Sequence, residues 1–308
     1  MEKLEKYRKL CKYVQLFGMI AIVGGGLVLV FFLQRANQQS QTLLLTYSFA
    51  IIVVLLAFML FVNVPMQNNL LKKIILESLN GLVTDVKFNK KKGYNRESFN
   101  KLKITNKPFN QYGCQDYYSF NYNNMLIEST TVRAYDEIKV DEPRKNNKNK
   151  TKKVKKAINY FYGRIYVIPI ATNQTLNIYG KKNPTMSRKK EMENDDYCNE
   201  YPLKIKKYNE NFEVFYKGDK PSIDVQSLLE KLYSLKLAAK GTIYAFIRKK
   251  NMVICIDNGH YYAEVETKNP IDESIVRGYR KDVNMVLTFI NSMKVFSIET
   301  KEEESGEH

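Results

Sequence analysis

Two long apolar runs near the start of the chain limit what it can fold into. The first, Tyr13 to Leu33, reads YVQLFGMIAIVGGGLVLVFFL and contains no charged residue. The second, Leu43 to Val64, reads LLLTYSFAIIVVLLAFMLFVNV, and a nine-residue link separates the two. About twenty helical residues cover the roughly 30 Å hydrocarbon core of a bilayer. The runs therefore predict a two-helix transmembrane hairpin over residues 13–64.

The basic residues around these runs predict the orientation of the hairpin. The N-terminal tail, residues 1–12, carries five Lys or Arg, the link carries only Arg35, and Lys72 and Lys73 follow the second run. Cytoplasmic flanks are enriched in Lys and Arg, so we expect a multi-pass protein of the inner cell membrane with both ends in the cytoplasm. A cleaved signal peptide is the alternative, but the first run exceeds the usual length of about 7 to 15 residues.

Small residues in the first run predict a helix-packing face. Ala21 and Gly25 are four residues apart, a spacing that allows two membrane helices to approach closely. The partner is either the second run, where Ala50 and Ala57 share a face, or a second copy of the chain in a homo-oligomer.

The rest of the chain predicts an α+β fold with an antiparallel sheet and packed helices. Segments rich in aromatic and β-branched residues alternate with turn residues, as strands do. Helical spacing occurs over residues 68–83, 222–239 and 272–294, with Ser222 as the expected N-cap of the second. We expect a juxtamembrane helix and basic linker over residues 65–110, the α+β domain over 111–296, and an acidic tail over 297–308.

A basic segment interrupts the predicted strands. Residues 144–156 read RKNNKNKTKKVKK, and eight of these thirteen residues are positive. We interpret the segment as an exposed hairpin loop that is simply solvated, or that binds anionic lipid or an acidic protein partner. Nucleic acid is the weakest candidate, because the segment has no aromatic residue. The residues concerned are Arg144, Lys145, Lys148, Lys150, Lys152, Lys153, Lys155 and Lys156.

Composition adds little to this interpretation. The net charge is +17, but Lys and Asn are abundant everywhere, as the codon bias of an AT-rich genome would produce. The four cysteines lie far apart and match no zinc or disulfide spacing, so free thiols in a reducing compartment are expected. They are Cys11, Cys114, Cys198 and Cys255.

Candidate chemistry is sparse. His260 follows a turn shortly after Cys255, and a Cys–His pair is a known nucleophile arrangement, but further catalytic groups do not accompany it. Residues 191–196, EMENDD, lack the spacing of a calcium loop and are expected to be a solvated acidic segment. The sequence therefore indicates no catalytic residue, cofactor or metal.

Several segments, in order, resemble one bacterial family. They are FYGRIYVIPI, NENFEVFYKGD, SIDVQSLLEKLYSL and IYAFIRKKNMVICI, followed by a long final helix. This region, residues 99–294, is similar to the bacterial domain family of unknown function DUF3137. The resemblance implies two N-terminal spans before a cytosolic α+β domain, and it implies no reaction.

These observations favour a membrane-anchored cytosolic interaction or scaffold module. Such a module would bind a protein partner and could also bind anionic lipid. The alternative is a membrane-bound enzyme or transport-associated subunit whose site the sequence does not reveal.

Overall fold

The computed structural model divides the chain into two compact units. The first unit consists of residues 1–78 and 262–279, and the second of residues 79–261 and 280–308. The structure describes residues 2–35, 46, 49–55, 57–58, 61–62, 64–89, 92–144, 147–170, 172, 174–185, 187–193, 195–248, 250–259, 270–271 and 273–293.

The first unit is built on one long helix. α1 spans Glu2–Arg35, and α3 spans Val64–Leu79. The start of α1 packs within the unit, since Cys11 is fully buried. The Lys73 ammonium of α3 lies 3.8 Å from the centre of the Tyr7 ring of α1, a cation–π contact that joins the two helices.

Beyond these first turns, the side chains of α1 are apolar and exposed. Phe17 and Leu27 leave 68% and 69% of their surface uncovered. Among the described residues, α1 is the one helix that is long and apolar enough to cross a membrane, in agreement with the predicted first run. The predicted second span, Leu43 to Val64, lies largely outside the described residues. The two-span hairpin therefore stays a prediction.

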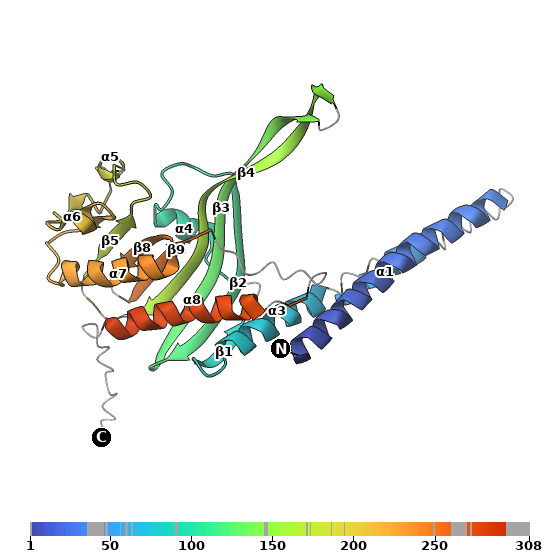
Figure 1. Ribbon diagram of the computed structural model, residues 1–308, viewed down its shortest axis with the longest axis horizontal. Helices are drawn as coiled ribbons and strands as arrows, with labels where there is room; N and C mark the ends of the chain where they lie inside the picture. The colour runs from blue at the N-terminus through green and yellow to red at the C-terminus, as the bar shows by residue number, and fades with distance from the viewer. Residues whose placement is uncertain are drawn as a thin grey trace, which may run out of the picture. The chain divides into compact units, whose positions relative to one another are not determined.

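The described strands of the second unit form one nine-stranded sheet (Figure 1). The order across the sheet is β1-β2-β3-β4-β9-β8-β5-β7-β6, and every neighbouring pair is antiparallel. The strands are β1 (Thr84–Phe88), β2 (Gln111–Tyr122), β3 (Met125–Arg144), β4 (Asn147–Pro169), β5 (Leu176–Gly180), β6 (Asn199–Glu200), β7 (Phe212–Tyr216), β8 (Thr242–Ile247) and β9 (Asn251–Asp257).

Helices accompany this sheet, which confirms the predicted α+β class with an antiparallel sheet. α7 packs against β8 with its leucine face buried (Figure 1). Its N-cap is Asp224, whose carboxylate accepts a hydrogen bond from the Ser227 backbone, and not Ser222 as predicted. The helices are α4 (Arg96–Lys101), α5 (Lys189–Met192), α6 (Lys206–Asn209), α7 (Val225–Ala239) and α8 (Glu273–Ser292).

An aromatic core cluster explains why the predicted basic linker is folded instead. Phe99 of α4 packs on Phe161 of β4 with ring centroids 5.3 Å apart, and Tyr244 of β8 lies 6.4 Å from Phe161. Burial of these rings stabilises the folded state by more than the repulsion between the nearby basic residues destabilises it. Residues 84–110 therefore supply β1 and α4 to the sheet domain, which begins before the predicted boundary at residue 111.

β4 and β9 approach each other closely at Gly163. A Cβ on this residue would lie 1.8 Å from the Ile256 carbonyl oxygen, so only glycine fits there. Gly163 pairs regularly with Asp257. The register of the β3–β4 pair shifts at two other points, between Ala134 and Tyr135 and between Pro143 and Arg144.

Candidate functional site

The Lys-rich segment forms strands, and the predicted loop was wrong. β3 and β4 stay paired out to Arg144 and Asn147. The last β3 residue paired with β2 is Tyr135, and the first β4 residue paired with β9 is Gly163. Beyond those points the two strands pair with each other and project from the sheet (Figure 1). We call residues 137–157 the basic ribbon.

Cross-strand pairs explain why such a polar segment forms strands. Val140 lies directly opposite Val154, and Asp141 lies opposite Lys153. The Lys155 ammonium reaches the carboxylate of the β3 residue Glu137 at 2.7 Å. Aliphatic pairs and opposite charges both stabilise neighbouring antiparallel strands. The acids that precede the lysines in sequence are thus the partners that turn the segment into a ribbon.

The basic ribbon keeps a large excess of positive charge. It contains nine Lys or Arg residues against three Asp or Glu residues. Lys153, Lys155 and Lys156 have exposed side chains. The structure describes only the backbone of Arg144, Lys148, Lys150 and Lys152, and Lys145 lies outside the described residues. The predicted basic residues that are described therefore lie on one projecting element.

One face of the basic ribbon combines lysine with aliphatic side chains. Opposed residues and residues two apart share a face, which places Ile138, Val140, Val154 and Lys156 together. Ile138 is 38% exposed and the two valines are half-buried. Ile158 continues this stripe toward the sheet. The face can therefore bury apolar area against another surface while its lysine meets a carboxylate.

The predicted helix-packing residues lie on α1. Ala21 is half-buried and Gly25 is exposed. No described atom lies within 4 Å of a Cβ placed on Gly25. Close packing at this spacing, within the chain or between two copies, stays a prediction.

The cysteine of the predicted Cys–His pair is part of the core. Cys255 is fully buried in β9, and burial raises the pKa of its thiol well above the usual value. A thiol of this kind is a poor nucleophile, because the thiolate is the reactive form. His260 lies outside the described residues. The cysteine thus has a packing role in this structure.

The acidic segment at 191–196 is tied to basic side chains. Asp195 pairs with Lys103, and the Asp196 carboxylate lies 2.6 Å from the Lys217 ammonium. Glu191 lies 3.6 Å from the guanidinium of Arg188. Within the described part of the chain, no three His, Cys, Asp or Glu side chains gather closely enough to hold a metal ion.

A buried charge cluster lies inside the sheet domain. The Arg164 guanidinium donates to Asp116 at 3.0 Å and lies 3.9 Å from the Asp282 carboxylate of α8. Asp116 also accepts a hydrogen bond from the Thr131 backbone, and Tyr118 shares the arginine at 3.3 Å. Such satisfied buried pairs hold neighbouring elements in register. We read this cluster as structural.

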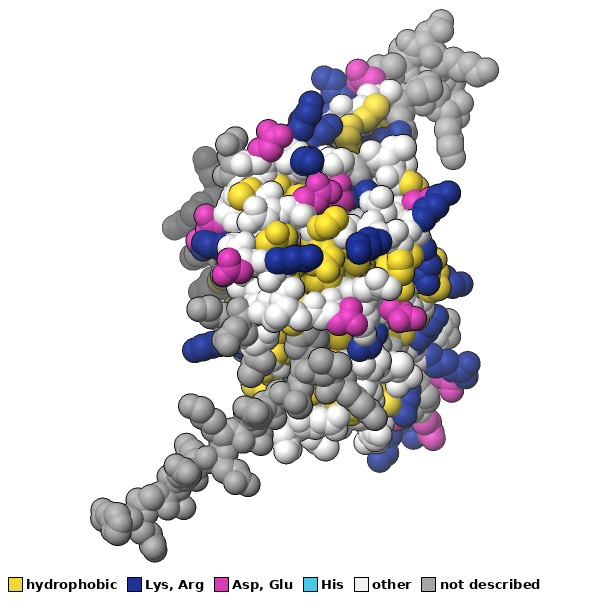
Figure 2. Space-filling view, turned by 90° about the vertical axis from the view of Figure 1, so that its left-hand side faces the viewer, with side chains coloured by type: hydrophobic (Ala, Val, Ile, Leu, Met, Phe, Trp, Pro, Cys, Tyr) yellow, Lys and Arg dark blue, Asp and Glu magenta, His cyan; other side chains and the backbone are white. Residues whose placement is uncertain are grey.

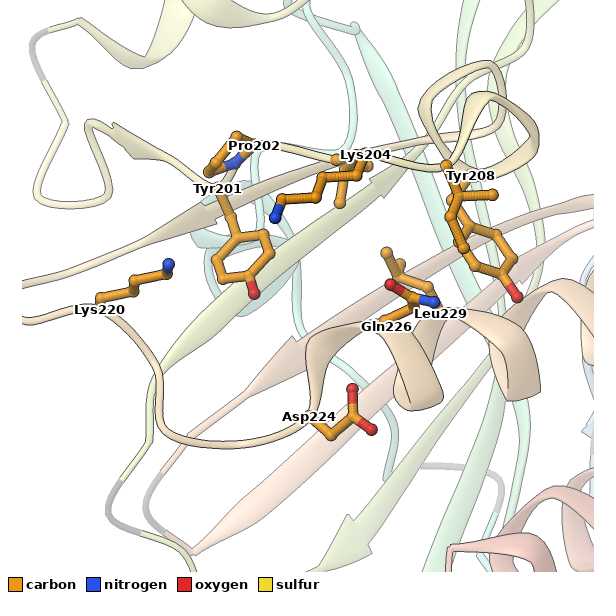
Figure 3. A pocket seen from close by; sticks show the side chains of 10 residues that line it. Tyr201, Pro202, Lys204, Tyr208, Lys220, Asp224, Gln226 and Leu229 are labelled. Atoms are coloured by element: carbon orange, nitrogen blue, oxygen red, sulfur yellow. The ribbon is translucent and has the colours of Figure 1, made fainter.

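A cavity of about 230 Å³ separates the segment after β6 from the start of α7. Figure 3 shows Tyr201 above the first turn of α7, from which Asp224 and Gln226 extend. The Lys220 ammonium lies 5.4 Å from the centre of the Tyr201 ring. The carboxylate that lines this cavity is exposed and already caps α7. The cavity therefore offers a mixed polar surface without a buried acid among its lining residues.

Sequence spacing gives little signal for such cavities. The lining residues come from two neighbouring stretches of the chain, residues 201–208 and 220–229, and their apolar and polar types form no recognisable motif. On the face shown in Figure 2, Lys and Arg side chains lie among acidic and apolar ones. Charge on this face is therefore mixed, whereas on the basic ribbon it has one dominant sign.

Comparison with known proteins gives no relative from which a role could be transferred. No protein-family model matches the chain, so its resemblance to DUF3137 stays a prediction. No curated protein and no solved structure matches it either.

Proposed function

We propose that this chain is a membrane-held, non-enzymatic interaction module that binds the acidic surface of a protein partner. The observation that carries this proposal is the basic ribbon, two strands that leave the sheet and hold exposed lysines away from it. Clustered charge of one sign speeds association with an oppositely charged surface and orients the two partners.

The pattern of the ribbon favours a protein over a lipid surface. Its acids, among them Glu137 and Asp141, alternate with lysines, and such a pattern matches a surface of defined charge positions. Aromatic residues that anchor proteins at a membrane interface do not occur between residues 137 and 157. The same lack of aromatic residues disfavours a single-stranded nucleic acid, whose bases stack on them.

Lysines also discourage exposed strand edges from pairing with other chains. That role requires only a few charges along the edge. Nine basic residues, together with a half-exposed aliphatic stripe, exceed what edge protection requires. Recognition of a partner accounts for both features at once.

The membrane part of the proposal rests on α1. This helix is apolar and exposed over most of its length. We propose that it crosses the inner membrane, that the second apolar run returns, and that the sheet domain lies in the cytoplasm. The distribution of Lys and Arg supports this orientation.

Two variants of the full chain test the ribbon. In one, Lys153, Lys155 and Lys156 are replaced by Gln. In the other, residues 139–155 are replaced by Asn-Gly, because Ile138 pairs directly with Lys156 and a two-residue turn can join them. The matched control replaces three exposed lysines elsewhere, Lys204, Lys206 and Lys207, by Gln.

In-cell crosslinking followed by affinity purification and mass spectrometry is the measurement. We expect a specific acidic protein with the unchanged chain and the control, and its loss from both ribbon variants at normal abundance. Identical partners for all four chains would overturn the proposal. Enrichment of anionic lipid or nucleic acid in place of a protein would also overturn it.

A further inference from the structure

A pocket of about 610 Å³ opens where the end of α7 meets the residues that follow β5. Four lysines line it: Lys181 and Lys182 follow β5, Lys236 is in the last turn of α7, and Lys240 is the C-cap. Asp257 is the one carboxylate among the lining residues. Ammonium groups repel each other, so a group of four is unfavourable unless negative charge balances it.

Neighbouring acids balance the two lysines that follow β5. The Lys182 ammonium lies 2.6 Å from the Asp257 carboxylate. The Lys181 ammonium lies 3.9 Å from the carboxylate of Glu213, which is itself buried. These two amines are therefore held in place at the pocket wall, with most of their charge already compensated.

The two lysines of α7 lack such compensation. The Lys236 ammonium donates to the side-chain oxygen of Asn211 at 2.5 Å, which is a neutral partner. Burial lowers the pKa of Lys236 because the surroundings disfavour its charged form. Lys240 is exposed and makes no ion pair with any residue that the structure describes. The pocket thus has two positive charges available to an anion.

The backbone at Lys240 has a conformation that is costly for a residue with a Cβ. The residue has φ 51° and ψ 42°, the left-handed conformation in which helices commonly end. Glycine adopts this conformation without the steric penalty of a Cβ and is favoured there. Glycine at this position should therefore stabilise the helix end, and it would remove the amine that Lys240 contributes to the pocket lining.

The dipole of α7 explains only part of the cluster. Basic side chains near the C-terminus of a helix are stabilised by the partial negative charge there, which would account for Lys236 and Lys240. Lys181 and Lys182 follow β5 and are balanced by Glu213 and Asp257 instead. The dipole carries only a partial charge, so the ammonium groups of Lys236 and Lys240 keep most of their positive charge.

We infer that this pocket binds a small molecule through a phosphate group. Lysine binds phosphate as a point charge, and a doubly negative group matches the two uncompensated amines. Leu237, 60% exposed beside the amines, offers apolar area to the rest of the ligand. This inference does not depend on the basic ribbon.

Calorimetric titration of the full chain in nonionic detergent tests the inference. The probes are inorganic pyrophosphate and inorganic phosphate. Lys240→Gly removes one uncompensated amine while it relieves the backbone, and Lys236→Gln removes the other. Lys206→Gln is the control, since Lys206 is exposed and lies outside the pocket.

We expect saturable binding of pyrophosphate to one site, weaker for phosphate. Loss of a hydrogen bond to a charged group should weaken binding at least about tenfold in Lys240→Gly and in Lys236→Gln. The melting temperature of Lys240→Gly should rise, which separates lost binding from lost folding. The inference would be overturned by non-saturable binding to the unchanged chain, or by pocket variants that bind pyrophosphate as tightly as the unchanged chain. A loss of affinity in Lys206→Gln equal to that in the pocket variants would also overturn it.

Discussion

The two halves of the β3–β4 hairpin use the same hydrogen-bonding pattern in opposite surroundings. In the inner half, Phe161 and Ile165 are fully buried, β2 pairs with β3 as far as Tyr135, and β9 pairs with β4 from Gly163 onward. In the outer half, which consists of the basic ribbon and the adjoining Ile158, Ile138 and Ile158 are 38% and 45% exposed. Its strands pair with each other alone beyond Tyr135 and Gly163.

This difference separates folding from recognition. Burial of apolar surface stabilises the inner half, and the ladder of the outer half continues a pairing that the inner half has already fixed. An isolated two-stranded ribbon is marginally stable in water. The ribbon therefore depends on the core, and we expect the core not to depend on the ribbon.

The largest expected effect is in the inner half. Phe161→Ala removes a fully buried ring that contacts Phe99 and Tyr244, and should lower the free energy of unfolding by about 3–5 kcal/mol. Ile158→Ala in the outer half should change it by about 0.5 kcal/mol or less. Denaturant titration of the full chain in detergent measures both. Equal losses of unfolding free energy in the two variants would show that the inner half is no more important for stability than the outer half.

A smaller loss of stability is expected where β4 and β9 approach each other closely. Gly163→Ala forces a Cβ against the Ile256 carbonyl and should cost about 1–3 kcal/mol, as overpacking typically does. Gly113→Ala on β2 is its match, because a Cβ there meets no atom within 4 Å. Thermal unfolding should separate the two variants. If Gly163→Ala were as stable as Gly113→Ala, the close approach of β4 and β9 would be wrong.

A pH-dependent effect is expected at Glu128, on the inner half of β3. Burial raises the pKa of its carboxyl, but hydrogen bonds from Lys92 and Tyr117 outweigh burial and leave the pKa lowered. A lowered carboxyl pKa stabilises the fold above the unfolded value of about 4.3, and this contribution is lost as pH falls through the folded value.

The melting-temperature advantage of the unchanged chain over Glu128→Gln should therefore be present at neutral pH. It should shrink below about pH 4. An advantage that grew on acidification would have the wrong sign and would contradict the contacts of Glu128.

The smallest effect is expected within the ribbon. Glu137→Gln breaks the pair with Lys155, but both side chains are exposed, and exposed ion pairs contribute little to stability. We expect no resolvable change in melting temperature at any pH tested. A clear loss would mean that the ribbon is stabilised by its charges and not by the sheet behind it.

Much of the sheet domain was predictable from local patterns. The strands β7, β8 and β9 and the helix α7 stand out in sequence because their apolar residues recur at the spacing of two or of three and four. The sequence gives no sign of α4 within the predicted basic linker, because Phe99 is buried by residues on other elements, such as Phe161 and Tyr112.

The candidate sites were less predictable from the sequence than the fold. The lysines of the ribbon were evident, but their strand conformation depends on pairing with acids that precede them, which charge counting does not reveal. The lysine pocket could not be predicted from the sequence. Lys181 and Lys240 line the same pocket only because β5 and β8 are neighbours in the sheet. The left-handed backbone of Lys240 was equally invisible in sequence.

Hydrogen exchange of the full chain tests the central claim most directly, in membranes of the cells that express it and after extraction into detergent. We predict that amides of residues 138–142 and 153–156 are protected in the membranes and exchange fast after extraction, when the partner is lost. Amides of residues 163–168 should stay protected in both. Equal exchange of the ribbon amides in membranes and in detergent would contradict the account.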